Sequence, residues 1–374
     1  MLYGVILAGG GGTRLWPESR ENRPKQFFKF DGKRTILAET VERVQPLIPM
    51  SRTLIATGAG QVSAVAEAVE LFPKANILTE PFRRNTAPAI GLAALEVIAR
   101  NPHGIMAVLP SDHLIEPADQ FRETLCAAAE LVAEDPERIV TIGIAPTRPA
   151  TGFGYIQVGE ALGSPAAVNR RHTATAFSVA SFHEKPDRET AEQYLADGNF
   201  LWNAGIFVWK AARVLELFNL YQPEIGEKLE AIKKTLYHDD GEEILRENYA
   251  AMTAISIDMA IMEKADRIVT LAAPLNWNDI GSFESLDALY DSDKDAAGNV
   301  AQGIRLLTVD GHNNIVRWNV GAQDAKSELL AIIGVDDIEV VRQGNAILIA
   351  KKGSDAKIRE LVSRIKSEKL DEFL

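Results

Sequence analysis

Four consecutive glycines, Gly9–Gly12, follow an apolar stretch at the start of the chain and lead into Thr13 and Arg14. Glycine allows backbone torsions closed to other residues and lets a ligand approach the main chain, where successive N–H groups can bind an anion. A run of glycines can also be a flexible turn. The first 34 residues, however, hold seven Lys and Arg side chains against three acidic ones, in a chain of net charge −12. A basic segment beside glycines in an acidic protein indicates a small anionic ligand.

Two well-known phosphate-binding loops do not match this segment. A dinucleotide-binding loop needs a third glycine where Arg14 stands, and the loop of nucleotide triphosphatases ends in Gly-Lys-Ser/Thr. Here Arg14 and, further on, Lys25 follow the glycines instead. We expect both on exposed loops, where a guanidinium and an ammonium group suit the charge of a reacting triphosphate. Arg14 and Lys25 are therefore the candidate catalytic residues.

Up to about residue 290 the chain alternates short apolar, β-branched runs with stretches rich in Ala, Leu and Glu. The runs predict strands and the longer stretches predict helices. Strands are expected at 2–8, 53–57, 76–79, 105–109 and 139–144, and helices at 86–100 and 119–133. This order predicts an α/β fold, in which a mainly parallel, buried sheet binds ligands at the carboxyl ends of its strands.

A different pattern begins after residue 294. Short apolar runs between residues 305 and 350 alternate with glycines at roughly ten-residue spacing, which predicts a small all-β domain. Residues 357–370 place apolar side chains on one helical face, so we expect a terminal helix. The sequence therefore predicts two domains, 1–294 and 295–374.

Composition argues against several other classes of protein. The 374 residues are 46% hydrophobic and 25% charged, as in globular proteins with a core. No apolar run approaches the ~20 residues of a membrane span, and the N-terminus lacks the basic region of a secretory signal. The acidic balance disfavours nucleic-acid binding. With Cys126 as the only cysteine, no internal disulfide or multi-Cys metal site is expected, and a cytoplasmic enzyme fits best.

Seven motifs follow one another along the first 282 residues. They are residues 7–27, 80–90, 110–113, 151–156, 182–187, 202–207 and 276–282. In this order they resemble the signature motifs of the sugar-nucleotide nucleotidyltransferases, and most closely those of the mannose-1-phosphate guanylyltransferase family. Residues 310–316 and 333–341 are similar to the C-terminal β-helical domain of that family. The resemblance implies a Rossmann-like mixed, mainly parallel sheet flanked by helices, then a small β-helical domain with a terminal helix.

The resemblance also implies roles for particular residues, with Arg14 and Lys25 acting on the triphosphate. The nucleotide would be bound by Leu7, Ala8, Gly9, Gly10, Gly12, Thr13, Glu80, Asn85, Thr86 and Asp112. The sugar phosphate would be bound by Gly154, Glu184, Lys185 and Asn203. Taken singly, an aspartate after a strand is more often a turn residue. Within these motifs, Asp112 and Asp279 would hold one Mg²⁺ or Mn²⁺, which proteins bind through one or two carboxylates plus substrate phosphates.

Glu80 adds a physical reason for guanine as the base. The Watson–Crick edge of guanine presents two adjacent donors, the ring N1–H and the exocyclic amine, and an ionised carboxylate can accept both. Adenine presents a bare ring nitrogen there, which a carboxylate would repel. The alternative is that Glu80 is only a solvated acid at the end of a strand.

The reaction implied by the resemblance is transfer of GMP from GTP to α-D-mannose 1-phosphate, which gives GDP-mannose and pyrophosphate. Two alternatives stay open. One is the same chemistry on another sugar 1-phosphate, such as a heptose or glucose, or with another NTP. The other is a non-catalytic regulatory or nucleotide-sensing homologue. The partners would be the two substrates, with no nucleic acid and no membrane, and a homodimer is compatible with the family. Without the cupin-type domain of longer relatives, mannose-6-phosphate isomerase activity is not expected.

Overall fold

The computed structural model describes residues 1–374 except 11–14, 21–22, 30–33, 164–173 and 320–327. The chain folds into two compact units, each built from separated stretches. Met1–Gly9 and Leu37–Trp277 form the first unit, and Gly10–Ile36 and Asn278–Leu374 form the second. The segment that follows the first strand therefore folds with the C-terminal stretch. The domain boundary expected after residue 294 stays a prediction.

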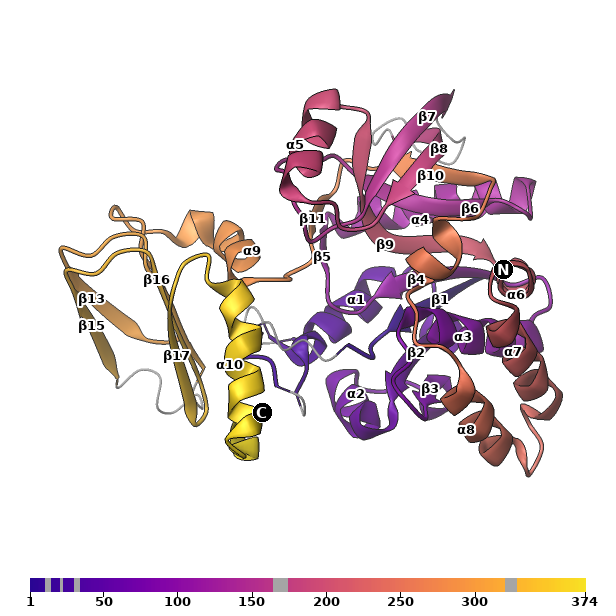
Figure 1. The fold of residues 1–374 in the computed structure, drawn as a ribbon, viewed down its shortest axis with the longest axis horizontal. Coiled ribbons are helices and arrows are strands. Elements are labelled where there is room, and N and C mark those ends of the chain that lie inside the picture. Colours follow the sequence, from indigo (N-terminus) through magenta and orange to yellow (C-terminus); the bar gives the residue numbers. More distant parts are fainter. Residues whose placement is uncertain (11–14, 21–22, 30–33, 164–173, 320–327) are drawn as a thin grey trace. The chain divides into compact units, whose positions relative to one another are not determined.

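A nine-stranded sheet lies at the centre of the first unit (Figure 1). Its spatial order is β3 (Ile77–Glu80), β2 (Thr53–Gly58), β1 (Leu2–Leu7), β4 (Ile105–Pro110), β9 (Phe200–Lys210), β6 (Ile139–Ile144), β10 (Ile268–Ala272), β8 (Thr175–His183) and β7 (Tyr155–Gly163). The pairs β3–β2, β2–β1, β1–β4 and β6–β10 are parallel. β9 is antiparallel to β4 and β6, and β8 is antiparallel to β10 and β7. Within this sheet β8 and β9 run against the other strands, so the prediction of a mixed, mainly parallel sheet is confirmed.

Helices between these strands cover the sheet. They are α1 (Ile36–Val44), α2 (Val62–Ala68), α3 (Thr86–Arg100), α4 (Ala118–Glu134), α5 (Arg188–Asp197), α6 (Ala211–Tyr221), α7 (Pro223–Thr235) and α8 (Gly241–Ala251). α3 is buried along most of its length and packs against α6 and α7. Gly91 permits this approach, because a Cβ there would lie 2.6 Å from Leu229 Cδ1 of α7. Among the described residues, no helix is both long and apolar enough to cross a membrane.

The carboxyl ends of β1, β2, β3 and β4 share one edge of the sheet, because these four strands are parallel. Gly9 follows β1, Glu80 ends β3 and Asp112 follows β4. After Asp112, β5 (Leu114–Glu116) pairs with β11 (Asn276–Asn278) in a separate two-stranded sheet. Three predicted nucleotide-binding residues thus lie at the edge where such sheets bind ligands.

The C-terminal stretch of the second unit forms a small β-helix. β12 (Val300–Gln302), β14 (Ile315–Asn319) and β16 (Ile338–Gln343) pair in parallel, followed by the antiparallel β17 (Ala346–Lys351), while β13 (Arg305–Val309) pairs in parallel with β15 (Leu329–Ile333). Val316, Ile332 and Val340 fill its interior. The helices α9 (Phe283–Asp287) and α10 (Asp355–Ser367) flank these strands in the sequence. The predicted all-β domain and terminal helix are confirmed.

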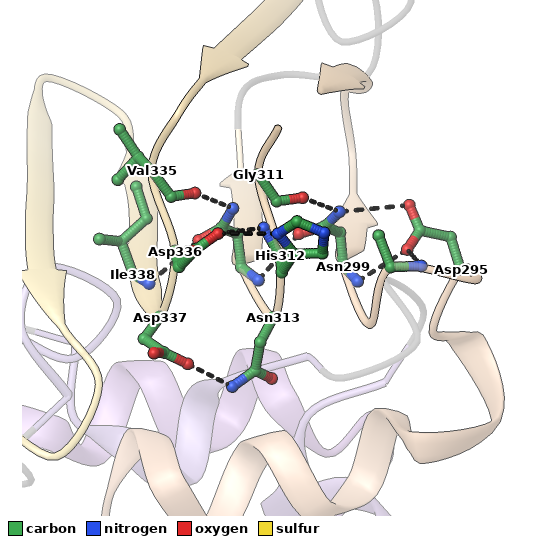
Figure 2. Close-up of polar contacts among 11 residues, drawn as sticks. Asp295, Asn299, Gly311, His312, Asn313, Val335, Asp336, Asp337 and Ile338 are labelled. Carbon is green, nitrogen blue, oxygen red and sulfur yellow. Dashed lines mark hydrogen bonds and ion pairs between the residues drawn. The ribbon is translucent and has the colours of Figure 1, made fainter. Parts of the chain in front are cut away.

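Buried asparagines join successive coils of the β-helix at their turns (Figure 2). Asn299 donates to the carbonyl oxygen of Gly311 (3.0 Å) and accepts from the N–H of Asn314 (2.9 Å). Asn314 repeats this pattern one coil later, with Val335 (2.8 Å) and Ile338 (3.1 Å). Because both amides are buried, their donors and acceptors need these partners. The side chains therefore fix the register of one coil on the next.

Candidate nucleotide and sugar-phosphate site

The main chain of Leu7 and Ala8 is fixed between the neighbouring strands. The N–H of Ser111, after β4, donates to the carbonyl oxygen of Leu7 (3.2 Å), and the hydroxyl of Thr57, in β2, donates to that of Ala8 (3.0 Å). These bonds hold the start of the glycine-rich segment at the carboxyl edge of the sheet. Gly10 begins the second unit. Gly12, Thr13 and Arg14 lie outside the described residues, so the roles expected for them stay predictions.

Glu80 is buried, with 7% of its surface exposed, although it is an acid at the end of a strand. Its Oε2 accepts a hydrogen bond from the hydroxyl of Tyr249 in α8 (2.6 Å), and its Oε1 lies 3.1 Å from where a Cβ on Gly9 would stand. Burial raises the pKa of Glu80, while the Tyr249 hydrogen bond and the charge of Arg83 act in the opposite direction. The structure thus brings the predicted residues Gly9 and Glu80 together, and Glu80 is not a solvated side chain.

Asn85 and Thr86 both make local bonds at the start of α3. Asn85 has a φ of 66° and a ψ of −167°, a backbone region that residues other than glycine rarely adopt, and its Oδ1 accepts from the N–H of Thr86 (2.8 Å). The Thr86 hydroxyl accepts from the N–H of Ile257 (2.8 Å). These residues therefore shape the loop after Glu80 and join it to the segment that follows α8.

Asp112 follows β4 and its side chain is 35% exposed. Its Oδ1 lies 3.7 Å from Nε2 of His113, and the indole N–H of Trp277 donates to Nδ1 of His113 (3.1 Å). An accepting Nδ1 leaves the proton of the neutral ring on Nε2, toward Asp112. Through His113, the predicted metal-binding segment at Asp112 is joined to Trp277, two residues before Asp279.

Lys25 and Asp279 meet within the second unit. The ammonium group of Lys25 donates to the main-chain oxygen of Asp279, and Oδ1 of Asp279 accepts from the N–H of Gly281 (3.0 Å). Lys25 is buried, with 8% exposed, in the short helix Lys25–Phe27. The expectation of an exposed loop is therefore wrong for Lys25, because the neighbouring Gln26 and Phe27 are also buried and draw the segment inward.

The chemistry of Asp112 and Asp279 fits a hard divalent cation, because both offer carboxylate oxygens. Within the described ranges, no group of three or more His, Cys, Asp or Glu side chains could hold a metal ion. Asp112 belongs to the first unit and Asp279 to the second, so their shared metal site stays a prediction.

The four predicted sugar-phosphate residues lie together. The N–H of Asn203 donates to the carbonyl oxygen of Gly154 (2.8 Å), and a Cβ on Gly154 would lie 2.8 Å from Oε2 of Glu184. Lys185 pairs with the carboxylate of Glu184. A larger residue at position 154 would therefore shift the Glu184 carboxylate. This cluster presents hydrogen-bonding groups and one cation, as a sugar phosphate requires.

Asp258 completes this cluster and was not predicted from the sequence. The side-chain amide of Asn203 donates to Oδ1 of Asp258 (2.8 Å). Burial, together with the negative charge of Glu184, raises the pKa of Asp258 to about 6. In the sequence, Asp258 is only a single acidic residue before the apolar run 259–262. Without the fold, this pattern does not indicate a site residue.

Replacing Asp258 by Asn is expected to stabilise the protein above pH 6. The pKa of Asp258 is about 6 in the folded protein, above its ordinary value of 3.8. The folded state therefore binds this proton more tightly than the unfolded state, and the protein loses stability as the pH rises from about 4 to 6 and the carboxyl ionises. Asn keeps an acceptor for Asn203 but cannot ionise. We expect a gain of up to about 3 kcal/mol at pH 8 and little at pH 4. Urea unfolding across this range measures it, with Asp266→Asn, at an exposed position, as control. An equal gain at both pH values would contradict the assignment.

The C-terminal stretch holds the segment that carries Lys25. Arg317 in β14 makes an ion pair with Glu18 (Nε–Oε1, 2.8 Å), and the two side chains are 3% and 0% exposed. The Arg317 guanidinium also donates to the hydroxyl of Tyr290 (2.5 Å) and lies 4.6 Å from the ring centre of Phe28. Nearer the C-terminus, the carbonyl oxygen of Phe373 accepts from the indole of Trp16 (2.7 Å). The β-helix and tail therefore hold Trp16, Glu18 and Phe28.

This fold and the arrangement of the candidate site residues are those of a known class of enzymes. Residues 3–295 match the family model described as nucleotidyl transferase, and residues 305–365 match that of the MannoseP isomerase/GMP-like beta-helix domain. The chain belongs to the nucleotidyl transferase family.

Similar proteins in this family carry more particular names. The chain is 36% identical to Mannose-1-phosphate guanylyltransferase 2 of Escherichia coli O157:H7, over 100% of this chain and 75% of that protein. It is 34% identical to the alginate biosynthesis protein AlgA of Pseudomonas aeruginosa, over 97% of this chain and 72% of that protein. A solved structure from Thermus thermophilus, described as mannose-1-phosphate geranyltransferase, has a TM-score of 0.83 and 32% identity. That similarity covers 98% of this chain and 99% of the other.

Proposed function

We propose that this chain transfers GMP from GTP to α-D-mannose 1-phosphate and forms GDP-mannose and pyrophosphate. The observation that carries the proposal is the buried Glu80 carboxylate beside Gly9, at the carboxyl edge of the sheet. A group that only accepts hydrogen bonds matches the two adjacent donors of guanine. A relative that is similar over the whole chain is named mannose-1-phosphate guanylyltransferase 2, which supports mannose 1-phosphate as the sugar substrate.

The reaction is an in-line displacement at phosphorus. An oxygen of the mannose phosphate attacks the α-phosphorus of GTP and forms a new O–P bond. The bond from the α-phosphorus to the oxygen shared with the β-phosphorus breaks, and pyrophosphate leaves with that electron pair. Such transfers depend mostly on positioning and on stabilising charge.

Side chains of the first unit would hold the mannose phosphate. Glu184, Asn203 and Asp258 would accept from or donate to sugar hydroxyls, and the main chain at Gly154 would let the sugar approach closely. Lys185 would exchange its bond with Glu184 for the phosphate of the sugar. The pairing of Lys185 with Glu184 supports this role, because it keeps the ammonium group beside the other sugar-binding residues.

Charge on the triphosphate would be met by Arg14 and Lys25, which neutralise the departing pyrophosphate. Asp112 and Asp279 would hold a Mg²⁺ or Mn²⁺ ion. When bound, the ion would withdraw charge from the phosphate oxygens and orient them.

The test of the proposal is product formation across a panel of nucleoside triphosphates and sugar 1-phosphates. Pyrophosphate release and chromatographic detection of the sugar nucleotide are measured together, with Mg²⁺ present. We expect GTP with mannose 1-phosphate to give the highest kcat/KM. A higher value for a heptose or glucose 1-phosphate, or for another NTP, would reassign the substrates. No product from any pair would refute the activity.

Replacing Glu80 by Gln tests the carboxylate as the reader of the base. Gln presents one acceptor and one donor, so one donor of guanine loses its partner. We expect kcat/KM for GTP to fall roughly 10- to 100-fold and the advantage over UTP or dTTP to narrow, with the Mg²⁺ dependence unchanged. Glu96→Gln is the matched control, because Glu96 is also buried and also accepts from a tyrosine hydroxyl. An unchanged preference for GTP would remove Glu80 from base recognition.

A further inference from the structure

A tyrosine from a distant part of the chain makes the hydrogen bond to the Glu80 carboxylate. Tyr249 lies in α8, 169 residues further along the chain, and its side chain is fully buried. The 2.6 Å between its hydroxyl oxygen and Oε2 of Glu80 is typical of a hydroxyl that donates to an ionised carboxylate. Burial, together with the charge of Glu80, raises the pKa of Tyr249 far above its usual range. The phenol therefore stays a donor.

Several further bonds hold α8 and the residues after it against the loop that begins at Glu80. Arg84 donates to the carbonyl oxygen of Ala250, next to Tyr249 (2.5 Å). The guanidinium groups of Arg84 and Arg246 lie 5.9 and 5.3 Å from the ring centre of Phe82. The N–H of Ala87 donates to the carbonyl oxygen of Ile255 (3.1 Å). These contacts hold the backbone around Tyr249 in place beside the loop that begins at Glu80.

The hydrogen bond leaves most of the accepting capacity of Glu80 in place. A carboxylate has about four lone-pair sites, and Tyr249 occupies one of them on Oε2. Oε1 faces Gly9, where a missing side chain leaves space. The terminal torsion of a glutamate is broad, so an unrestrained carboxylate would rotate between many planes. The bond to Tyr249 selects one of these planes.

We propose that Tyr249 is a positioning residue for base selection, which orients the Glu80 carboxylate so that it accepts the N1–H and the exocyclic amine of guanine together. The inference rests on the proposed function, since it assumes that Glu80 reads the base. It assigns to α8 a part in specificity, although α8 provides no atom that contacts the nucleotide in this scheme.

The test compares GTP with ITP in the wild type and in Tyr249→Phe. The base of ITP keeps the N1–H of guanine but lacks the exocyclic amine, so it needs one acceptor and tolerates a rotated carboxylate. We expect Tyr249→Phe to lower kcat/KM for GTP about tenfold, mainly through KM, and to lower that for ITP much less. KM for mannose 1-phosphate should stay unchanged. An equal loss for GTP and ITP would mean that Tyr249 only supports the fold.

Two further variants test whether the effect is specific to the bond between Tyr249 and Glu80. Tyr237→Phe removes another tyrosine hydroxyl that donates to a glutamate, Glu96 (3.0 Å), and should leave the preference for GTP over ITP unchanged. In a Glu80→Gln background, Tyr249→Phe should have no further effect on that preference, because Tyr249 acts through the carboxylate. A full effect in that background would overturn the proposal. If Tyr249→Phe does not fold, Tyr249→Met, which also lacks the hydroxyl, takes its place in each comparison.

Calorimetric binding of GTP and ITP distinguishes a failure of this inference from a failure of the proposed function. A wild type that forms no GDP-mannose, yet binds GTP more tightly than ITP with a preference that Tyr249→Phe reduces, would refute the activity and keep the role of Tyr249. A chain that forms GDP-mannose and retains its preference in Tyr249→Phe would refute the role of Tyr249 alone.

Discussion

Replacing either Asp112 or Asp279 by Asn is expected to lower kcat for GDP-mannose formation by about 10²–10³-fold. Asn keeps the shape of each side chain and, at Asp279, an acceptor for the N–H of Gly281, but it removes the negative charge that binds a divalent cation. The melting temperature should change little in either variant, since neither aspartate is buried. Steady-state kinetics over a range of Mg²⁺ concentrations measures the effect, and both variants should need more Mg²⁺ for half-maximal rate.

Asp266→Asn is the matched control for this pair, because it removes a charge from an exposed aspartate outside the predicted site. It should leave kcat and the Mg²⁺ requirement unchanged. EDTA should abolish the activity of the wild type, and Mg²⁺ or Mn²⁺ should restore it. Full activity in excess EDTA would refute the two-carboxylate metal site.

Arg317→Ala should lower the free energy of unfolding by about 3–5 kcal/mol. Removing one member of a buried ion pair leaves the other without a compensating charge, and Glu18 is fully buried. Burial already raises the pKa of Glu18 despite the opposing charge of Arg317, which indicates how unfavourable its environment is for a lone carboxylate. Urea unfolding at pH 7 measures the loss. Because Glu18 lies between the glycine-rich segment and Lys25, kcat should fall as well.

Arg342→Ala provides the comparison from the neighbouring strand β16. Arg342 also pairs with a glutamate, Glu328 (3.0 Å), but these side chains are 27% and 36% exposed. Pairs of this kind typically contribute less than about 1 kcal/mol. If Arg317→Ala destabilised the protein no more than Arg342→Ala, the Glu18–Arg317 pair would not be what holds the segment.

Local sequence patterns predicted much of the fold. The Ala-rich, apolar stretch at 86–100 coincides with α3, and the glycine-punctuated runs after residue 305 became the strands of the β-helix. These elements follow from short-range periodicity, which the sequence contains directly. The reversed direction of β8 and β9 could not be read in this way, because strand direction depends on which strands pair and not on the residues of one strand.

Candidate site residues that lie in a sequence motif were predicted. Those that only the fold brings near the motif residues were missed. Gly9 and Glu80 lie in two of the motifs, and the structure brings these two residues together. The four sugar-phosphate residues also lie in motifs, and the structure brings them together with one another. Tyr249 and Asp258 lie 169 and 55 residues along the chain from their hydrogen-bond partners Glu80 and Asn203, with no local pattern to mark them. The burial of Lys25 was missed for a similar reason, since it depends on packing that a loop-like sequence does not reveal.

The contacts between residues 10–36 and the C-terminal stretch constrain how such a protein can be recombined. Arg20 donates to the carbonyl oxygen of Gln343 (2.8 Å) and to the side chain of Asn345 (2.9 Å), and Trp16 and Glu18 also bind partners beyond residue 290. A chimera that exchanges only the C-terminal stretch with a homologue would therefore separate this segment from the side chains that bind it. The unit to exchange in engineering is therefore discontinuous. The β-helix and the loop that follows the first strand should be exchanged together.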